Sequence, residues 1–237
     1  MYYRIQNSLN NKIIGCFTQV QDFKAPSDWD TNPHFIETVE FERVEFEPIL
    51  SIGILAKKAK LTDLLSTSSV GFTRKLLVSS KFKEILEEVG NSNFQFFECV
   101  ILINTEEYQY WLISPVLAQY KFVDFFKSDV VARKDKPEGG TYLQAIDVSF
   151  NHDFSNFINS QGIDSWKTVI NHVFFKEDLI HDFFALGHVE GGVGYFVSER
   201  LKKVIEEQSL TGIEFKPSEL NLGEWLGGTR ERIYGKA

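Results

Sequence analysis

The chain has 237 residues, of which 43% are hydrophobic and 24% charged, a composition that excludes a disordered protein. Its formal net charge of −8, with scattered Lys and Arg, opposes nucleic-acid binding and favours a basic partner. The two cysteines, Cys16 and Cys99, are too few for a disulfide framework and lack metal-ligand spacing, so we expect reduced thiols in a cytoplasmic protein.

The N-terminal residues do not resemble a secretory signal, because no basic segment followed by an apolar run is present. The longest apolar stretch, residues 94–103, is interrupted by Gln95 and Glu98 and falls short of the roughly 18 residues that span a bilayer. We therefore expect neither export nor insertion into a membrane.

Residues 28–47 are the most acidic stretch, with seven acids against the single base Arg43. Apolar and acidic residues alternate over 39–42 and again over 44–47, which predicts strands with a bulge or tight turn at Arg43. The stretch is either a partner-facing surface or the wet side of an edge strand guarded by like charges. The candidate partner-binding residues are Asp28, Asp30, Glu40, Glu42, Glu45 and Glu47.

A short helix is expected over residues 56–65. The next feature is an internal repeat, in which residues 78–96 align without gaps on residues 197–215. Six of these nineteen positions are identical, whereas random pairing would give about one. The identical positions are Val78, Ser79, Lys83, Glu87, Glu88 and Phe96.

Each copy predicts a strand, a helix and a second strand. A short apolar run ends at Ser79 or Ser198, whose hydroxyl can cap the following helix. One apolar stripe with helical spacing follows, then a polar break and an alternating segment. We therefore expect an α+β fold of mixed sheets with this duplicated unit at about 76–97 and 195–216, and with helices minor to strands.

Other elements carry weaker signals. Residues 108–113 and 120–126 are expected to be strands, and residues 166–175 fit a helix or a strand. Residues 133–140 are charged and contain Pro137 and two glycines, which predicts a loop and a boundary. The chain would then divide into residues 1–135 and 136–237, or form one continuous domain. The tail from Leu222 is expected to be partly exposed.

Three features invite a catalytic interpretation that their context opposes. The glycines at 191, 192 and 194 precede a strand, whereas a phosphate loop follows one, so they predict a turn. Cys99 lies in an apolar strand, where a thiol packs inertly. Ser79 and Ser198 lack the glycines of a nucleophile elbow. We expect no catalytic residue and no cofactor.

A polar cluster in the C-terminal half contains residue types that bind divalent metals. No pair in it has the spacing that places two imidazoles on one element, and interleaved apolar residues indicate an amphipathic segment. A metal-dependent enzyme using His172, His181 and His188 remains an alternative. The cluster consists of His172, Glu177, Asp178, His181, Asp182, His188 and Glu190.

Several segments between residues 61 and 217 together resemble the immunity protein 11 family of bacterial polymorphic toxin systems. The strongest is the run from Phe196 to Lys202 with the Thr-Gly-Ile-Glu-Phe that follows it. The first sixty residues add nothing to the likeness. The segments are residues 61–66, 77–83, 110–113, 177–184, 196–202 and 210–215.

The resemblance implies a cytoplasmic antitoxin that binds and blocks a cognate toxin, and it carries no catalytic residue over. A toxin with a basic surface would suit the net charge of −8. Besides the metal-dependent enzyme, an interaction module unrelated to toxins stays open. We expect no nucleic acid and no membrane among the partners.

Overall fold

The computed structural model describes residues 1–89, 93–148 and 154–237 and contains two mixed sheets. The larger sheet has seven strands in the order β13-β1-β12-β11-β10-β8-β9, and only its β10–β11 pair is parallel. Its strands are β1 (Tyr2–Asn7), β8 (Asp129–Asp135), β9 (Thr141–Ala145), β10 (Thr168–His172), β11 (Phe183–Val189), β12 (Gly192–Ser198) and β13 (Ile213–Pro217).

The second sheet has six strands in the order β2-β3-β6-β7-β5-β4, with β3 and β6 parallel. Its strands are β2 (Val20–Lys24), β3 (Ile52–Leu55), β4 (Leu64–Leu65), β5 (Leu76–Val78), β6 (Phe94–Ile103) and β7 (Glu106–Pro115). Strands outweigh helices, as the sequence predicts, so the chain is an α+β protein.

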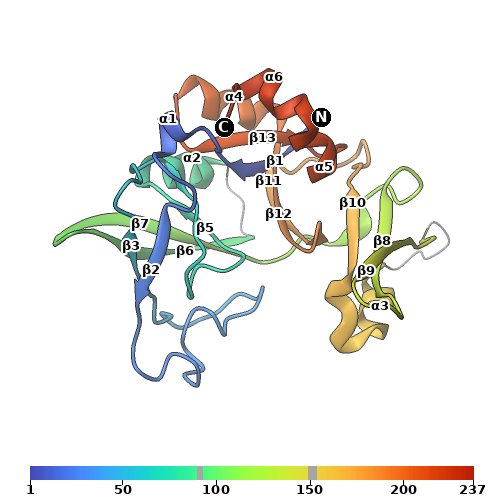
Figure 1. Cartoon of the computed structure of the whole chain (residues 1–237), viewed down its shortest axis with the longest axis horizontal. Helices are drawn as coiled ribbons and strands as arrows, with labels where there is room; N and C mark the ends of the chain where they lie inside the picture. The colour runs from blue at the N-terminus through green and yellow to red at the C-terminus, as the bar shows by residue number, and fades with distance from the viewer. Residues whose placement is uncertain (90–92, 149–153) are drawn as a thin grey trace.

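The helices are short. None of them within the described ranges is long and apolar enough to cross a membrane. They are α1 (Asn11–Ile14), α2 (Ser80–Glu88), α3 (Phe154–Ser160), α4 (Glu199–Glu207), α5 (Leu222–Glu224) and α6 (Arg230–Tyr234), with 3-10 turns η1 (Tyr120–Phe122) and η2 (Gly162–Lys167) and a π-helical turn η3 (Trp225–Thr229). Figure 1 shows α4 and α6 over the β13 end of the larger sheet.

Both expected strand-helix-strand units are present, as β5-α2-β6 and β12-α4-β13. Ser79 and Ser198 have nearly the same backbone angles, φ −68° with ψ 162° or 163°, and each hydroxyl accepts a hydrogen bond from the amide three residues later. Each serine hydroxyl also donates to an aspartate, Asp63 or Asp182, and each serine amide donates to that aspartate's carbonyl at 2.9 Å. Such caps each stabilise a helix by about 1 kcal/mol.

The same offset of 119 positions relates contacts on the helix faces. Lys83 lies 5.7 Å from the ring centre of Phe96, and Lys202 lies 5.8 Å from that of Phe215. Each lysine also pairs with a glutamate four residues later in its helix. The offset therefore holds for side-chain contacts as well as for the sequence.

The strand that completes each unit comes from a different part of the chain. In the first unit, β7 lies between β5 and β6 and follows β6 through a hairpin. In the second unit, β1 lies between β12 and β13, with Tyr3 opposite Val197 and Pro217. The N-terminal strand therefore belongs to the sheet built by the C-terminal half, as Figure 1 shows.

The two units share one hydrophobic core. Phe94 of β6 stacks on Phe183 of β11 with ring centres 4.0 Å apart, and both rings are buried. Phe82 from α2 and Leu201 from α4 enter the same cluster. A second core is formed by residues of the segment 20–61 and the strands of the smaller sheet. A third core packs α3 against the larger sheet.

The two units are also joined by a polar contact. The second carboxylate oxygen of Asp63 accepts hydrogen bonds from the amide and hydroxyl of Thr211, at 2.7 and 2.9 Å. Gly212 follows with φ +80°, and a Cβ there would lie 2.3 Å from the carbonyl oxygen of Leu64. The backbones approach so closely that only glycine fits.

Several local predictions are wrong. Residues 56–65 contain a turn and strand β4 instead of a helix, and residues 120–126 form η1 and a single bridge from Val123 to Phe175 instead of a strand. Residues 39–47 contain bends and no strand. The strand expected at 108–113 is confirmed within β7, and the ambiguous residues 166–175 contain the end of η2 and strand β10.

The expected loop at 133–140 is a hairpin. Residues 133–135 belong to β8, residues 136–140 turn, and β9 then pairs with β8 in antiparallel register. In the C-terminal tail the exposure is mixed, because Trp225 and Arg230 are buried whereas Leu222, Leu226 and Ile233 are exposed.

Candidate partner-binding site

The six candidate acids all lie on the surface of one irregular segment. We call Asp28, Asp30, Glu40, Glu42, Glu45 and Glu47 the acidic surface, and all six are exposed. None of them forms an ion pair with a residue of the described ranges; the one side-chain contact among them is a hydrogen bond from Asn32 to Asp28 at 2.9 Å. Their charge therefore faces solvent, and no described side chain neutralises it.

Apolar anchors hold this segment in place although it is not a strand. Phe35, Ile36 and Val39 are buried in a core that they share with strands of the smaller sheet. The Gln95 side chain of β6 forms two hydrogen bonds of 2.8 Å with the backbone of Val44. It accepts one from the Val44 amide and donates the other to the Val44 carbonyl. The acidic surface is thus built on fixed supports, which lowers the entropy lost on binding.

Glu37, the seventh acid of the stretch, has a structural role instead. It is only partly exposed, and its carboxylate accepts a hydrogen bond of 2.7 Å from the Gly71 amide. Gly71 has φ +90°, a left-handed conformation that glycine adopts without strain. Glu37 therefore fixes a neighbouring loop, and sequence alternation alone could not separate it from the exposed acids.

A pocket of about 300 Å³ lies where the acidic segment meets η2, and its lining includes Glu40, Phe41, Arg74 and Trp166. The Arg74 guanidinium lies 4.8 Å from the Trp166 ring centre and 6.0 Å from that of Phe41. Arg74 itself has φ +58°, unusual for a residue other than glycine. This cation–aromatic contact links the acidic segment to the C-terminal half, and no sequence pattern indicated it.

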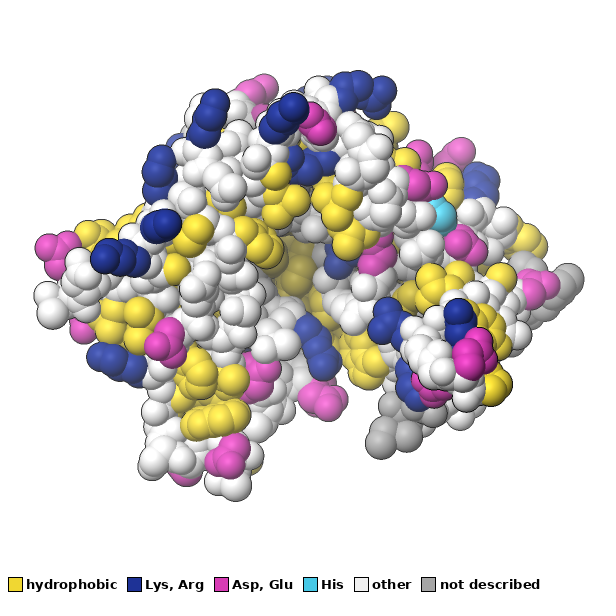
Figure 2. All heavy atoms as spheres, in the orientation of Figure 1, with side chains coloured by type: hydrophobic (Ala, Val, Ile, Leu, Met, Phe, Trp, Pro, Cys, Tyr) yellow, Lys and Arg dark blue, Asp and Glu magenta, His cyan; other side chains and the backbone are white. Residues whose placement is uncertain are grey.

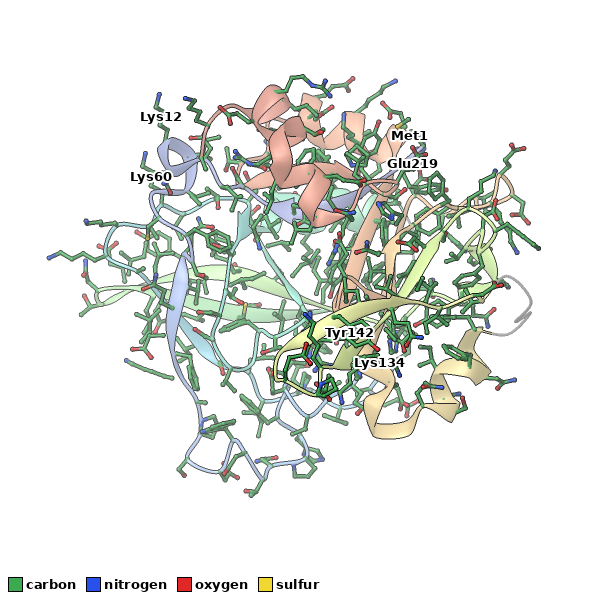
Figure 3. The ribbon with its side chains drawn as sticks, turned by 45° about the vertical axis from the view of Figure 1, so that its right-hand side comes forward. Met1, Lys12, Lys60, Lys134, Tyr142 and Glu219 are labelled. Carbon is green, nitrogen blue, oxygen red and sulfur yellow. The ribbon has the colours of Figure 1, made fainter. Side chains whose placement is uncertain are left out.

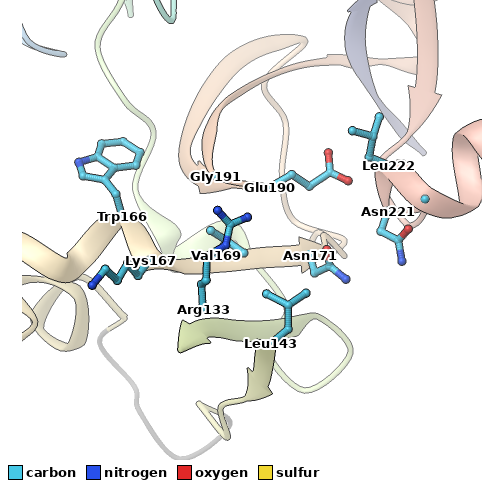
Figure 4. A pocket seen from close by; sticks show the side chains of 11 residues that line it. Arg133, Leu143, Trp166, Lys167, Val169, Asn171, Glu190, Gly191, Asn221 and Leu222 are labelled. Atoms are coloured by element: carbon cyan, nitrogen blue, oxygen red, sulfur yellow. The ribbon is translucent and has the colours of Figure 1, made fainter. Parts of the chain in front are cut away.

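The pocket belongs to a larger hollow on one face of the molecule. Figure 2 shows this hollow between the part formed by residues 28–47 and the part formed by β8, β9 and α3, with cationic and acidic side chains at its rim. A second pocket of about 300 Å³ lies on the β9 side, with Arg133, Leu143 and Trp166 among its lining residues (Figure 4).

The family comparison matches most of the chain. The model of the immunity protein family (Imm11) aligns with residues 1–220. The chain belongs to the Imm11 immunity protein family. The match includes the first sixty residues, which the motif resemblance did not reach, and therefore the whole acidic surface. A comparison with curated proteins finds no match.

Membership of Imm11 favours a protein that is not an enzyme, and the structure gives the metal-dependent alternative no support. No group of three His, Cys, Asp or Glu within the described ranges could hold a metal ion. Two of the four acids of the predicted cluster have other partners: Asp182 binds Ser198 and Arg200, and Glu190 binds Arg4 and Lys216.

The three imidazoles of that cluster lie in separate environments. His172 contacts the carboxylates of Asp129 and Glu224 at 3.3 and 2.9 Å, whereas His181 packs edge-on against Phe122. His188 is buried, stacks on Trp166 and has a ring nitrogen 3.1 Å from the Thr168 carbonyl. The structure therefore does not bring together the histidines that the sequence grouped.

The burial of His188 makes acid stability testable. Desolvation lowers the pKa of His188 below its usual 6.5, so below that pH the unfolded chain binds the proton more readily. The stability that depends on neutral His188 is complete above pH 6.5 and is lost as the pH falls. We expect the free energy of unfolding of His188→Phe, measured by urea denaturation, to fall less between pH 8 and pH 5 than that of wild type. An equal fall in both proteins would contradict this assignment.

The other residues considered for catalysis, in the glycine-rich segment, at Cys99 and at the two serines, have structural roles. Glu190 and Gly191 form the turn between β11 and β12, with φ +50° and +85°. Burial raises the pKa of the Cys99 thiol to about 12, so the thiolate that a nucleophile requires is disfavoured. Ser79 and Ser198 are helix caps.

Proposed function

We propose that this Imm11 protein is a cytoplasmic immunity protein that binds a cognate bacterial toxin through the acidic surface and blocks it. The observation that carries the proposal is the set of six exposed carboxylates, none of them in an ion pair with a described residue, on an anchored segment of a chain with net charge −8. Uncompensated charge at fixed positions favours a partner whose surface is basic there.

Electrostatic attraction would act mainly on the rate of encounter. Complementary charge can raise association rates well above the 10⁵–10⁶ M⁻¹s⁻¹ typical of neutral pairs, and salt screens the effect beyond about 8–10 Å. Fast capture suits a protein that must bind a toxin before it acts. A basic toxin surface is also what an enzyme acting on nucleic acid would present.

Binding affinity would depend on apolar contacts beside the charges. A standard interface buries on the order of 1,600 Å² and depends on a few aromatic anchors. Phe46, 37% exposed and packed on His34, lies among the acids, and Phe41 lines the adjacent pocket. These two rings are the anchors we expect at the centre of the contact, which would cover the toxin's active site or an adjacent exosite.

Growth rescue by co-expression tests the proposal. Cells that express the toxin encoded beside this gene should grow when the wild-type protein is co-expressed. The variant Glu40→Lys, Glu42→Lys, Glu45→Lys and Glu47→Lys should lose most of this protection, because it reverses the attraction while leaving the buried anchors unchanged. Continued killing despite folded wild-type protein would refute the proposed function.

The matched control reverses four exposed acids elsewhere. Glu84, Glu88, Glu107 and Glu207 lie on α2, β7 and α4, are exposed, and form no ion pair with a described residue. Their replacement by lysine changes the net charge equally. We expect this control to protect like wild type; equal loss of protection in both variants would mean that net charge, and not the acidic surface, determines binding.

A further inference from the structure

Strand β9 forms the outer edge of the larger sheet, and no other described strand covers it. β9 is the terminal strand, pairs only with β8 among the described residues, and all five of its residues are exposed. Its sequence, Thr-Tyr-Leu-Gln-Ala, has no charge and no proline, the usual guards against edge pairing. Tyr142 and Leu143 are 46% and 56% exposed on opposite faces.

The hydrogen-bond phase of the hairpin shows which backbone groups of β9 face away from β8. The Lys136 amide donates to the Gly140 carbonyl at 3.0 Å, and the Ile146 amide donates to the Val130 carbonyl at 2.9 Å. Hydrogen-bonded and non-hydrogen-bonded pairs alternate in an antiparallel ladder. The backbone N–H and C=O groups of Tyr142 and Gln144 therefore face β8. The backbone groups of Thr141, Leu143 and Ala145 therefore point to the open edge; Figure 3 shows Lys134 and Tyr142 together on this hairpin.

A cationic pocket opens beside this edge. Arg133 lies directly across the ladder from Leu143, so both side chains emerge on the face that lines the second pocket of about 300 Å³. Figure 4 shows Arg133 and Leu143 on one wall, with Leu222 and Glu190 opposite. Glu190 is already paired with Arg4 and Lys216, whereas the exposed Arg133 guanidinium forms no ion pair or hydrogen bond with any described residue.

The chemistry of the pocket therefore suits a carboxylate on an apolar chain. A guanidinium binds carboxylates with two parallel hydrogen bonds, which a lysine ammonium cannot provide. Leu143, Val169 and Leu222 provide apolar surface for the stem of the bound side chain. This positive site in a chain of net charge −8 is opposite in sign to the acidic surface across the hollow.

We propose that β9 accepts an extended segment of the toxin as an added strand, and that an acidic side chain of this segment enters the pocket and binds Arg133. The inference rests on the proposed function, because it specifies how the same partner docks. Backbone pairing provides affinity and the pocket selects the side chain. Opposite charges on the two sides of the hollow then fix the orientation of the toxin.

Backbone and side-chain variants separate the two parts of this docking mode. Leu143→Pro removes the outward amide but none of the hydrogen bonds to β8, so the hairpin is retained. Relative to Leu143→Ala, which keeps the amide, it should raise the Kd for the purified toxin domain at least about tenfold. Arg133→Glu should also weaken binding about tenfold, whereas Lys134→Glu, on the opposite face, should change it less than about threefold.

Hydrogen exchange of the wild-type complex provides the direct readout. Exchange at the Thr141, Leu143 and Ala145 amides should slow on binding, because those amides become paired. Tight wild-type binding with no such protection, and unchanged affinity in Leu143→Pro and Arg133→Glu, would overturn the docking mode and leave the proposed function standing. Failure of the wild type itself to bind would overturn both.

Discussion

Arg230→Met is expected to destabilise the protein by about 3–5 kcal/mol, because it removes one partner from a buried ion pair. The Arg230 guanidinium donates to both carboxylate oxygens of Glu214 at 2.8 and 2.6 Å, and the two side chains are only 4% and 2% exposed. Glu214 also accepts from the Ser8 hydroxyl and the Leu9 amide, so the pair fastens α6 and the N-terminal segment to β13. Without Arg230 the carboxylate is left buried with neutral donors only.

Urea denaturation measures this loss, and the same helix supplies the control. Arg232 is exposed, so Arg232→Met should change stability by less than about 0.5 kcal/mol. Combining Arg230→Met with Glu214→Leu should recover part of the loss, because no charge then stays buried. Equal effects of Arg230→Met and Arg232→Met would contradict a dominant role for the pair.

Phe183→Ala is expected to lower the free energy of unfolding by about 3–5 kcal/mol, and the protein should still unfold in a single transition. Phe183 is 1% exposed and its ring stacks on both Phe94 of the first unit and Tyr195 of the second. Its removal leaves a cavity in the core that both units share, so both should lose stability together. We propose on this basis that the chain folds as one continuous domain, and not as independent segments 1–135 and 136–237.

The shape of the denaturation curve separates these two possibilities. Coincident fluorescence and circular dichroism transitions are expected for wild type and Phe183→Ala alike. Ile180→Ala, at a position 85% exposed, is the control and should unfold like wild type. Two resolved transitions, of which Phe183→Ala shifts only one, would show that the halves fold separately.

Local sequence signals were sufficient for the helices of the two units. A capping serine, an apolar stripe and a polar break are properties of a few adjacent residues, and they correctly located α2 and α4 with their flanking strands. The insertion of β1 between β12 and β13 could not be predicted. Its partners lie about 200 residues away, and strand pairing over such a distance leaves no local pattern.

The wrong strand prediction at 39–47 has a physical cause. Alternation records which side chains are apolar, but a strand also requires a neighbouring backbone to pair with. Here the Gln95 side chain satisfies the Val44 backbone, and Val39 is buried in a hydrophobic core although it belongs to no strand. Leu64 and Leu65 show the reverse case, in which pairing with β5 prevails over an expected helix.

For the candidate site, the sequence identified exposed acids but not their setting. The six residues of the acidic surface are solvent-facing, as charged side chains usually are. The contacts of Arg74 with Phe41 and Trp166, and the open edge beside Arg133, depend on segments far apart in the chain. Only the charged turn and glycines near 136–140 marked the hairpin, and they suggested a boundary instead.

The most direct test of the account is the rate at which this protein associates with the purified toxin domain, measured by stopped-flow fluorescence at low and high salt. We expect the wild-type rate to fall steeply as salt rises, and the variant with lysine at 40, 42, 45 and 47 to associate slowly at every salt concentration. A wild-type rate independent of salt and equal to that of the variant would contradict recognition through the acidic surface.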